Sequence, residues 1–143
     1  SDTRSLTPAV AALLDDLGAA VHLLRDPTRG GLATVLTEVA RDTGLGIAVN
    51  EGALPVEEQV GSACEILGLD PLYVANEGIF VAVVGREQAP AAVELLRGRE
   101  ESREAAVIGE VVAAHPRQVV LNSRIGGRRV VNMLLGEQLP RIC

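Results

Sequence analysis

The chain has 143 residues, 48% of them hydrophobic and 1% aromatic; all 13 basic residues are arginines, and the net charge is −6. The aliphatic side chains suffice for a core, which excludes a disordered chain, and no apolar run approaches the roughly 18 residues of a membrane span. The acidic charge, the absence of lysine and the scarcity of aromatic residues argue against a nucleic-acid binder, and two cysteines do not suggest a disulfide framework.

The first part of the chain is predicted to be mainly helical. A first helix is expected from Thr7, as the capping residue, to the stop signal Gly18. A stronger amphipathic pattern covers residues 32–42 and ends at Gly44. A strand and a third helix follow, at residues 46–50 and 55–67.

Strands are predicted to dominate the last third. Two β-rich stretches, 72–75 and 79–84, flank the polar segment 76–78, and a fourth helix is expected at 88–96. Three more β-patterned segments lie at 106–112, 118–122 and 128–133, with a turn at 124–127. The order of elements predicts an α+β fold, in which helices pack on one face of a mixed, largely antiparallel sheet.

The segment 26–31, with the sequence Asp-Pro-Thr-Arg-Gly-Gly, is the first candidate site. Its glycines lie where a loop turns into the helix at 32–42, and free amides at a helix start together with the helix dipole attract anions. The alternative is structural, with Asp26 or Thr28 capping the helix. The segment is not a P-loop, because the Gly-Lys-Ser/Thr ending is absent.

The second candidate is Glu77, an acidic residue between two apolar β-rich stretches. A carboxylate in such surroundings can act as a general base, whereas the alternative is a turn residue on the surface.

The third candidate is Cys143, the last residue. The segment 136–143 has no periodicity and, fully extended, reaches roughly 25 Å at about 3.3 Å per residue. A thiol on such a segment can act as a travelling nucleophile, or it is an incidental terminal residue. Cys64 is instead expected to be an inert core cysteine, and the isolated His22 and His115 suggest no metal site.

These features together resemble one family. The segment 26–32 is similar to the glycine motif of the C-terminal domain in the PurM-like (aminoimidazole ribonucleotide synthetase) superfamily. The ending Pro140-Arg141-Ile142-Cys143 resembles the C-terminal signature of the HypE family, the carbamoyl dehydratases of [NiFe]-hydrogenase maturation. The resemblance covers the whole chain, but HypE proteins have an additional N-terminal domain, to which the family's active-site lysine belongs.

The resemblance implies a PurM-like C-terminal domain at residues 1–135 and a mobile tail at 136–143. It implies that Cys143 and Glu77 are catalytic, that Pro140 and Arg141 position the tail, and that no residue of this chain binds a metal. The residues that it assigns to substrate or phosphate binding are Asp26, Thr28, Arg29, Gly30, Gly31 and Asn76.

The implied reaction starts when the carbamoyltransferase HypF carbamoylates the Cys143 thiol. ATP then drives dehydration to a thiocyanate, and the cyano group passes to iron on the HypC–HypD complex. ATP and Mg²⁺ are expected to bind mostly to the N-terminal domain, which also forms the family's homodimer, and none is expected on this part alone. The resemblance also implies a cytoplasmic protein with no nucleic-acid or membrane partner.

Two alternatives remain open from the sequence. One is the C-terminal domain of another PurM-like ATP-dependent synthetase or kinase, which would share the glycine motif but not the ending at Cys143. The other is a non-catalytic module whose tail docks a partner.

Overall fold

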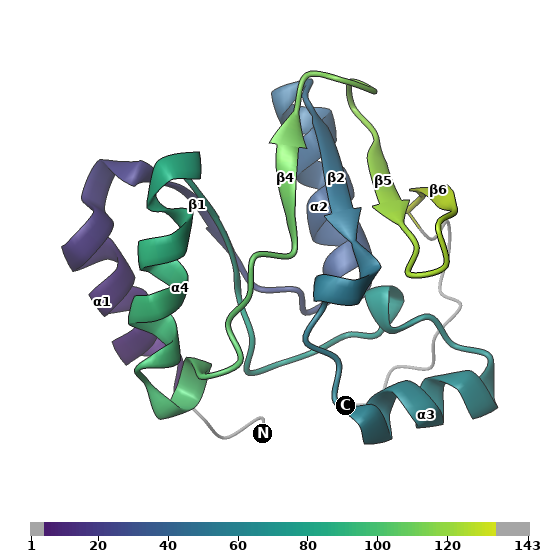
Figure 1. The fold of residues 1–143 in the computed structure, drawn as a ribbon, viewed down its shortest axis with the longest axis horizontal. Coiled ribbons are helices and arrows are strands. Elements are labelled where there is room, and N and C mark those ends of the chain that lie inside the picture. Colours follow the sequence, from purple (N-terminus) through teal and green to yellow (C-terminus); the bar gives the residue numbers. More distant parts are fainter. Residues whose placement is uncertain (1–4, 134–143) are drawn as a thin grey trace.

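The computed structural model describes residues 5–133 and contains two sheets with helices packed against them (Figure 1). The helices are α1 (Thr7–Leu17), α2 (Gly31–Thr43), α3 (Glu58–Leu67) and α4 (Ala89–Arg97). The strands are β1 (Val21–Arg25), β2 (Gly46–Asn50), β3 (Val81–Val84), β4 (Gly109–Val112), β5 (Val119–Asn122) and β6 (Arg128–Val131). Within this range no helix combines the length and the apolar character needed to cross a bilayer.

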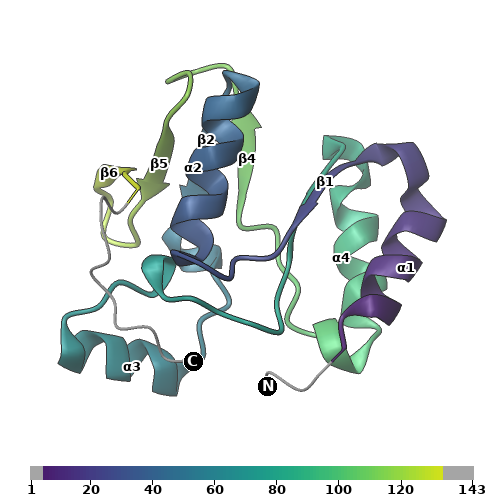
Figure 2. The same ribbon diagram turned by 180° about the vertical axis from the view of Figure 1, so that it is seen from behind.

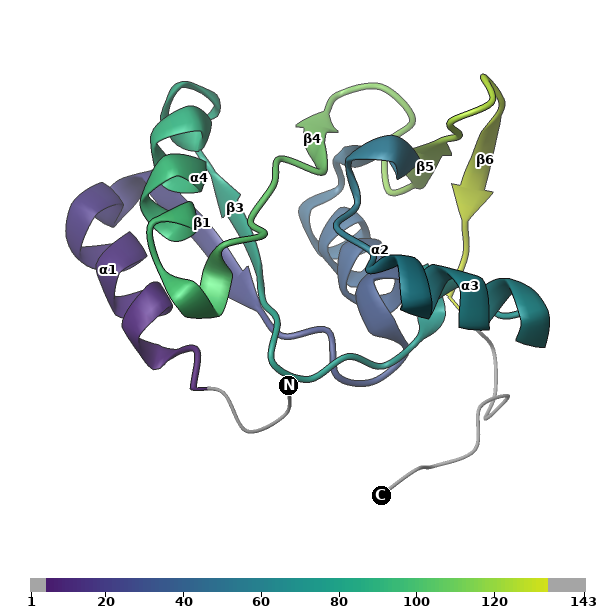
Figure 3. The ribbon, with the colours of Figure 1, turned by 60° about the horizontal axis from the view of Figure 1, so that its bottom comes forward.

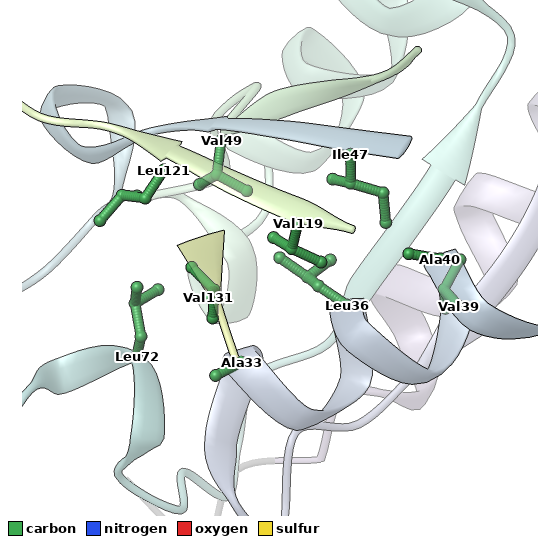
Figure 4. Packing of buried hydrophobic residues seen from close by; sticks show 10 residues of the cluster. All are labelled: Ala33, Leu36, Val39, Ala40, Ile47, Val49, Leu72, Val119, Leu121 and Val131. Carbon is green, nitrogen blue, oxygen red and sulfur yellow. The ribbon is translucent and has the colours of Figure 1, made fainter. Parts of the chain in front are cut away.

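The larger sheet has the strand order β4-β2-β5-β6. β2 pairs antiparallel with β4 and parallel with β5, and β5 pairs antiparallel with β6. Helix α2 lies across one face of this sheet (Figure 2). The α2 core between them is formed by Ala33, Leu36, Val39, Ala40, Ile47, Val49, Leu72, Val119, Leu121 and Val131 (Figure 4).

The smaller sheet is an antiparallel ribbon of β1 and β3 that serves two cores. Leu24 and Ala82, which are paired in register, pack against the second core, formed by Ala9, Leu13, Ala92 and Leu96 of α1 and α4. Leu23 and Val81 pack instead against the α2 core. Alternate residues of a strand face opposite sides, so one short ribbon joins both halves of the molecule (Figure 3).

The predicted α+β class is confirmed, but the strands form two sheets rather than one. The fold needs β1, a strand that the sequence analysis did not assign, as the partner of β3. Thr7 as a helix cap is wrong: the cap position is Leu6, whose carbonyl already accepts the amide of Val10 at 3.0 Å, so Thr7 lies inside the first turn.

Two further elements differ from the prediction for local reasons. Helix α3 begins at Glu58 rather than Pro55, because Glu57 is extended and its carbonyl accepts the first helical bond, from Gly61, at 2.9 Å. The stretch 72–75 is not a strand. Residues Pro71–Tyr73 form the 3₁₀ helix η3, in which the Asp70 side chain caps the Leu72 amide at 3.0 Å.

The turn between β5 and β6, predicted at 124–127, is confirmed and is anchored by Glu51. One Glu51 carboxylate oxygen accepts hydrogen bonds from the Ser123 hydroxyl and the Arg124 amide, both at 2.9 Å. The Arg124 amide above all, and then the Ser123 hydroxyl, hold the pKa of Glu51 below its ordinary value of 4.5. Since these bonds favour the charged carboxylate, Glu51 links the hairpin to the end of β2 in a pH-dependent way.

We expect Glu51→Gln to lower the free energy of unfolding by about 0.5–1.5 kcal/mol at neutral pH, because the charged acceptor is lost. The contribution of Glu51 is fully present above its unfolded-state pKa, near 4.5, and disappears as the pH falls through its lower folded-state pKa. Denaturant unfolding at several pH values should therefore show wild type and variant converging under acid conditions. The exposed Glu104→Gln is the control, and a constant difference at every pH would contradict the assignment.

Candidate functional site

The segment 26–31 forms the loop that enters α2. Pro27 and Gly31 are buried, Thr28 is half-buried, and Asp26 and Arg29 are exposed. The cap position of α2 is Gly30, which has a left-handed φ of 70°, and no side chain caps the helix. Capping by Asp26 or Thr28, the structural alternative for this loop, is therefore wrong.

Gly31 is held against the backbone of η3. Its φ is 63°, and a Cβ atom added there would lie 2.5 Å from the Leu72 carbonyl oxygen and 2.6 Å from the Val74 carbonyl oxygen. These separations are far inside van der Waals contact. Only glycine therefore fits at this position, on both conformational and steric grounds.

The segment 76–78 lies beside the glycine loop. The Asn76 amide donates to the Pro27 carbonyl oxygen at 3.2 Å, which joins the two candidate segments directly. Asn76 and Glu77 are both exposed. The expected setting of Glu77 between two apolar strands is wrong, because η3 replaces the first strand and β3 begins only at Val81.

The structure thus brings together the glycine loop and the Glu77 segment, which lie more than 40 residues apart in the sequence. Cys143, Pro140 and Arg141 lie outside the described residues. The described chain ends at Met133, whose sulfur accepts a hydrogen bond from the Arg41 guanidinium of α2 at 3.1 Å.

Two shallow hollows flank the β5–β6 hairpin, and neither is lined by a residue of the two candidate segments. The larger, of about 550 Å³, is lined by Thr37, Arg41, Arg117, Gln118, Val119, Val130, Val131, Asn132 and Met133. The smaller, of about 200 Å³, is lined by Glu51, Leu121, Ser123, Ile125, Gly127, Arg128 and Arg129. The exposed residues of the two candidate segments are Asp26, Arg29, Asn76 and Glu77, and neither of these two hollows includes them.

The other cysteine and the two histidines lie apart from the two candidate segments in the sequence. Cys64 is buried in α3 at 6% exposure, which confirms the prediction of a core cysteine. His22 is exposed in β1 and His115 is half-buried in the β4–β5 connection. Within residues 5–133 no three His, Cys, Asp or Glu residues are grouped so that they could hold a metal ion.

Comparison with known proteins identifies the family to which this chain, with its two candidate loops, is similar. The family model "AIR synthase related protein, C-terminal domain" matches residues 3–122, most of the chain. This chain belongs to that family.

Within this AIR synthase related family, the chain is similar to HypE proteins. It is 50% identical over 143 residues to the carbamoyl dehydratase HypE of Azotobacter vinelandii, covering all of this chain and 42% of that protein. Two solved structures are similar over nearly the same span: HypE in complex with ATP, and a HypE–HypF complex. For the first, the TM-score is 0.90 at 46% identity, with 100% of this chain and 44% of that chain covered. For the second, it is 0.88 at 42% identity, with 94% and 43% covered.

These comparisons confirm the resemblance to the AIR synthase related family and to HypE. The chain spans less than half of the length of the curated relatives that it matches. The family model ends at residue 122, before β6 and the ending on which the sequence analysis based its resemblance to HypE. The matches to HypE proteins extend over all of the chain.

Two residues that contact each other beside η3 were missed by the sequence analysis. Asp70 caps η3, and its second carboxylate oxygen pairs with Arg129 of β6. Asp70 could have been found, because an Asp before Pro71 is a common start of a helical turn. Arg129 carries no comparable signal, since its partner lies 59 residues away in the sequence.

Gly31→Ala tests the backbone contact at the start of α2. Gly44 ends the same helix with a φ of 75° and has no heavy atom within 4 Å of an added Cβ, so Gly44→Ala measures the conformational cost alone. We expect Gly44→Ala to destabilise the fold by about 1–2 kcal/mol. Gly31→Ala should cost at least about 2 kcal/mol more, because its Cβ must displace the backbone of η3. Equal losses in thermal or denaturant unfolding would show that the contact with η3 is loose.

Proposed function

We propose that this chain is the C-terminal domain of a HypE-type carbamoyl dehydratase and supplies the cysteine that carries the reacting group. The observation that carries the proposal is the 50% identity to a carbamoyl dehydratase HypE over the whole chain. The two loops that meet through the backbone bond between Asn76 and Pro27 support it, because the segment that carries Glu77 adjoins the glycine loop there.

In the proposed reaction, the Cys143 thiolate attacks the carbonyl carbon of a carbamoyl group supplied by the carbamoyltransferase. The bond from that carbon to the donor's leaving group breaks, and Cys143 becomes an S-carboxamide. ATP transfers its γ-phosphoryl group to the carbamoyl oxygen, and ADP leaves. A base removes the two amide protons, phosphate departs with the oxygen, and a thiocyanate remains on the sulfur. The cyano group then passes to iron held by a HypC–HypD complex, which in this proposal also supplies the two electrons that break the S–C bond, so that Cys143 returns as the thiolate.

Each candidate residue has a role in this scheme. Glu77 is the base, and its exposed carboxylate is free to meet a substrate carried in from another part of the protein. The helix start at Gly30 and Gly31, with Asp26, Thr28, Arg29 and Asn76 around it, contacts phosphate or the developing oxyanion. The segment 136–143, which lies outside the described residues, follows the domain at 1–135 in this proposal and carries Cys143. Pro140 and Arg141 are proposed to position Cys143 for the carbamoyltransferase and for the ATP-dependent step.

The rest of the full-length protein completes the site in this proposal. The glycine loop and the Glu77 segment expose Asp26, Arg29, Asn76 and Glu77 to solvent, where groups from the rest of the protein can meet them. Most of the ATP contacts, the Mg²⁺ ligands and the homodimer surface are assigned to the N-terminal domain. A HypF-type carbamoyltransferase is the proposed carbamoyl donor, and the cytoplasm the proposed location.

The proposal predicts modification of Cys143 in two steps. Full-length protein, incubated with the carbamoyltransferase and carbamoyl phosphate, should carry a carbamoyl group on Cys143, which ATP converts to a thiocyanate visible by mass spectrometry. Cys143→Ala should show neither product. The present chain as the only dehydratase should stop at the carbamoyl stage, and thiocyanate formation by it alone would show that the N-terminal domain is not required.

Glu77→Gln in the full-length protein should leave carbamoylation of Cys143 intact and slow dehydration by about 10²-fold or more, because the base is removed. Glu87→Gln, at an exposed acidic position in the connection before α4, is the matched control and should behave as wild type. Thiocyanate formation at the normal rate by Glu77→Gln would assign the base to another residue.

A further inference from the structure

The ion pair between Asp70 and Arg129 connects the strand that leads to Cys143 with the two candidate loops. Arg129 lies in β6, which ends at Val131, so the chain continues from this strand towards Cys143. Asp70 lies immediately before η3. Its side chain and that of Arg129 are 32% and 47% exposed. A partly exposed pair adds little stability, so a role in geometry explains it better.

Asp70 uses its two carboxylate oxygens for different partners. Oδ1 accepts the Leu72 amide at 3.0 Å and so fixes the first turn of η3, while Oδ2 accepts the Arg129 guanidinium. The backbone of Asp70 adds a third restraint, because its carbonyl accepts the Tyr73 amide at 3.0 Å. The residue therefore sets both the shape of η3 and its place relative to β6.

The position of η3 in turn affects the glycine loop, because the two are in contact. The Leu72 side chain is buried in the α2 core, and the carbonyl groups of Leu72 and Val74 lie against the backbone of Gly31. Two residues later the Asn76 amide bonds to the Pro27 carbonyl. A shift of η3 therefore moves both the start of α2 and the segment that carries Glu77.

We propose that Asp70 is a positioning residue for dehydration: it fixes the position of the glycine loop and Glu77 relative to β6, the strand that precedes the Cys143 segment. Arg129 supports it by holding the carboxylate. The inference rests on the proposed function and adds a residue to that site. Neither Asp70 nor Arg129 is assigned a contact with the substrate, so both act through the backbone of η3.

The test uses three variants of the full-length protein that separate the two contacts. Asp70→Ala removes the cap and the ion pair, Asp70→Asn keeps an oxygen for the Leu72 amide, and Arg129→Met removes only the ion pair. Glu110→Gln is the matched control, because it breaks the exposed 2.6 Å pair with Arg86, which touches neither loop.

We expect Asp70→Ala to lower the kcat of ATP-dependent dehydration at Cys143 by about tenfold or more, since small displacements of reacting groups are costly. Carbamoylation of Cys143 and the KM for ATP should stay within about twofold of wild type, because neither is proposed to depend on the position of the two loops relative to β6. Asp70→Asn and Arg129→Met should each lose about threefold, so the conservative variant restores most of the rate. Glu110→Gln should match wild type.

Hydrogen exchange followed by mass spectrometry gives a readout that does not depend on activity. Peptides covering residues 72–78 should exchange faster in Asp70→Ala than in wild type. In Glu110→Gln their exchange rate should equal that of wild type.

An unchanged kcat in Asp70→Ala, or carbamoylation that falls as much as dehydration, would overturn the proposal. If Asp70→Ala fails to fold, Asp70→Asn and Arg129→Met decide by the same measurements. If wild type itself forms no thiocyanate, the proposed function fails, and the exchange data alone decide whether Asp70 places the loops.

Discussion

The contact between the backbone of Gly31 and the carbonyl groups of Leu72 and Val74 is the constraint on which the candidate site depends. It requires a residue without a side chain and a left-handed φ at the first position of α2, and Gly31 meets both conditions. Because the contact is between two backbones, it lets the 3₁₀ helix η3 approach α2 more closely than a side chain at this position would allow. The bond between Asn76 and Pro27 follows from that approach and sets the two loops side by side.

The β1–β3 ribbon holds the two cores of the molecule together, as the Gly31 contact holds the two loops. Its two faces pack against different cores, and the ion pair between Arg25 and Glu38 at 2.7 Å adds a polar link from β1 to α2. The glycine loop leaves directly from the end of β1, and the Glu77 segment enters β3, its neighbour in the ribbon. Both loops therefore adjoin the same pair of hydrogen-bonded strands, which limits how far they can separate.

Much of the fold follows from local patterns. The amphipathic stretch at 32–42 and its stop at Gly44 predicted α2 to within a residue at each end, because a strong helical period and a left-handed glycine are local signals. The short strand β1 was missed, since it is defined by its pairing with β3 some 60 residues later. The stretch 72–75 was misassigned because Asp70 and Pro71, rather than the β-rich composition, decide its shape.

By itself, the sequence determined the α+β class, the family resemblance and the identity of the candidate residues, because motifs, caps and periodicity involve neighbours in the chain. Only the tertiary structure decided that the glycine loop and Glu77 adjoin, that no side chain caps α2, and that Asp70 reaches Arg129. Such contacts join residues 40 to 60 positions apart, and each exists only after the sheets and helices have packed. A hydrogen bond between distant segments produces no periodic pattern in the sequence, so local sequence patterns could not have predicted it.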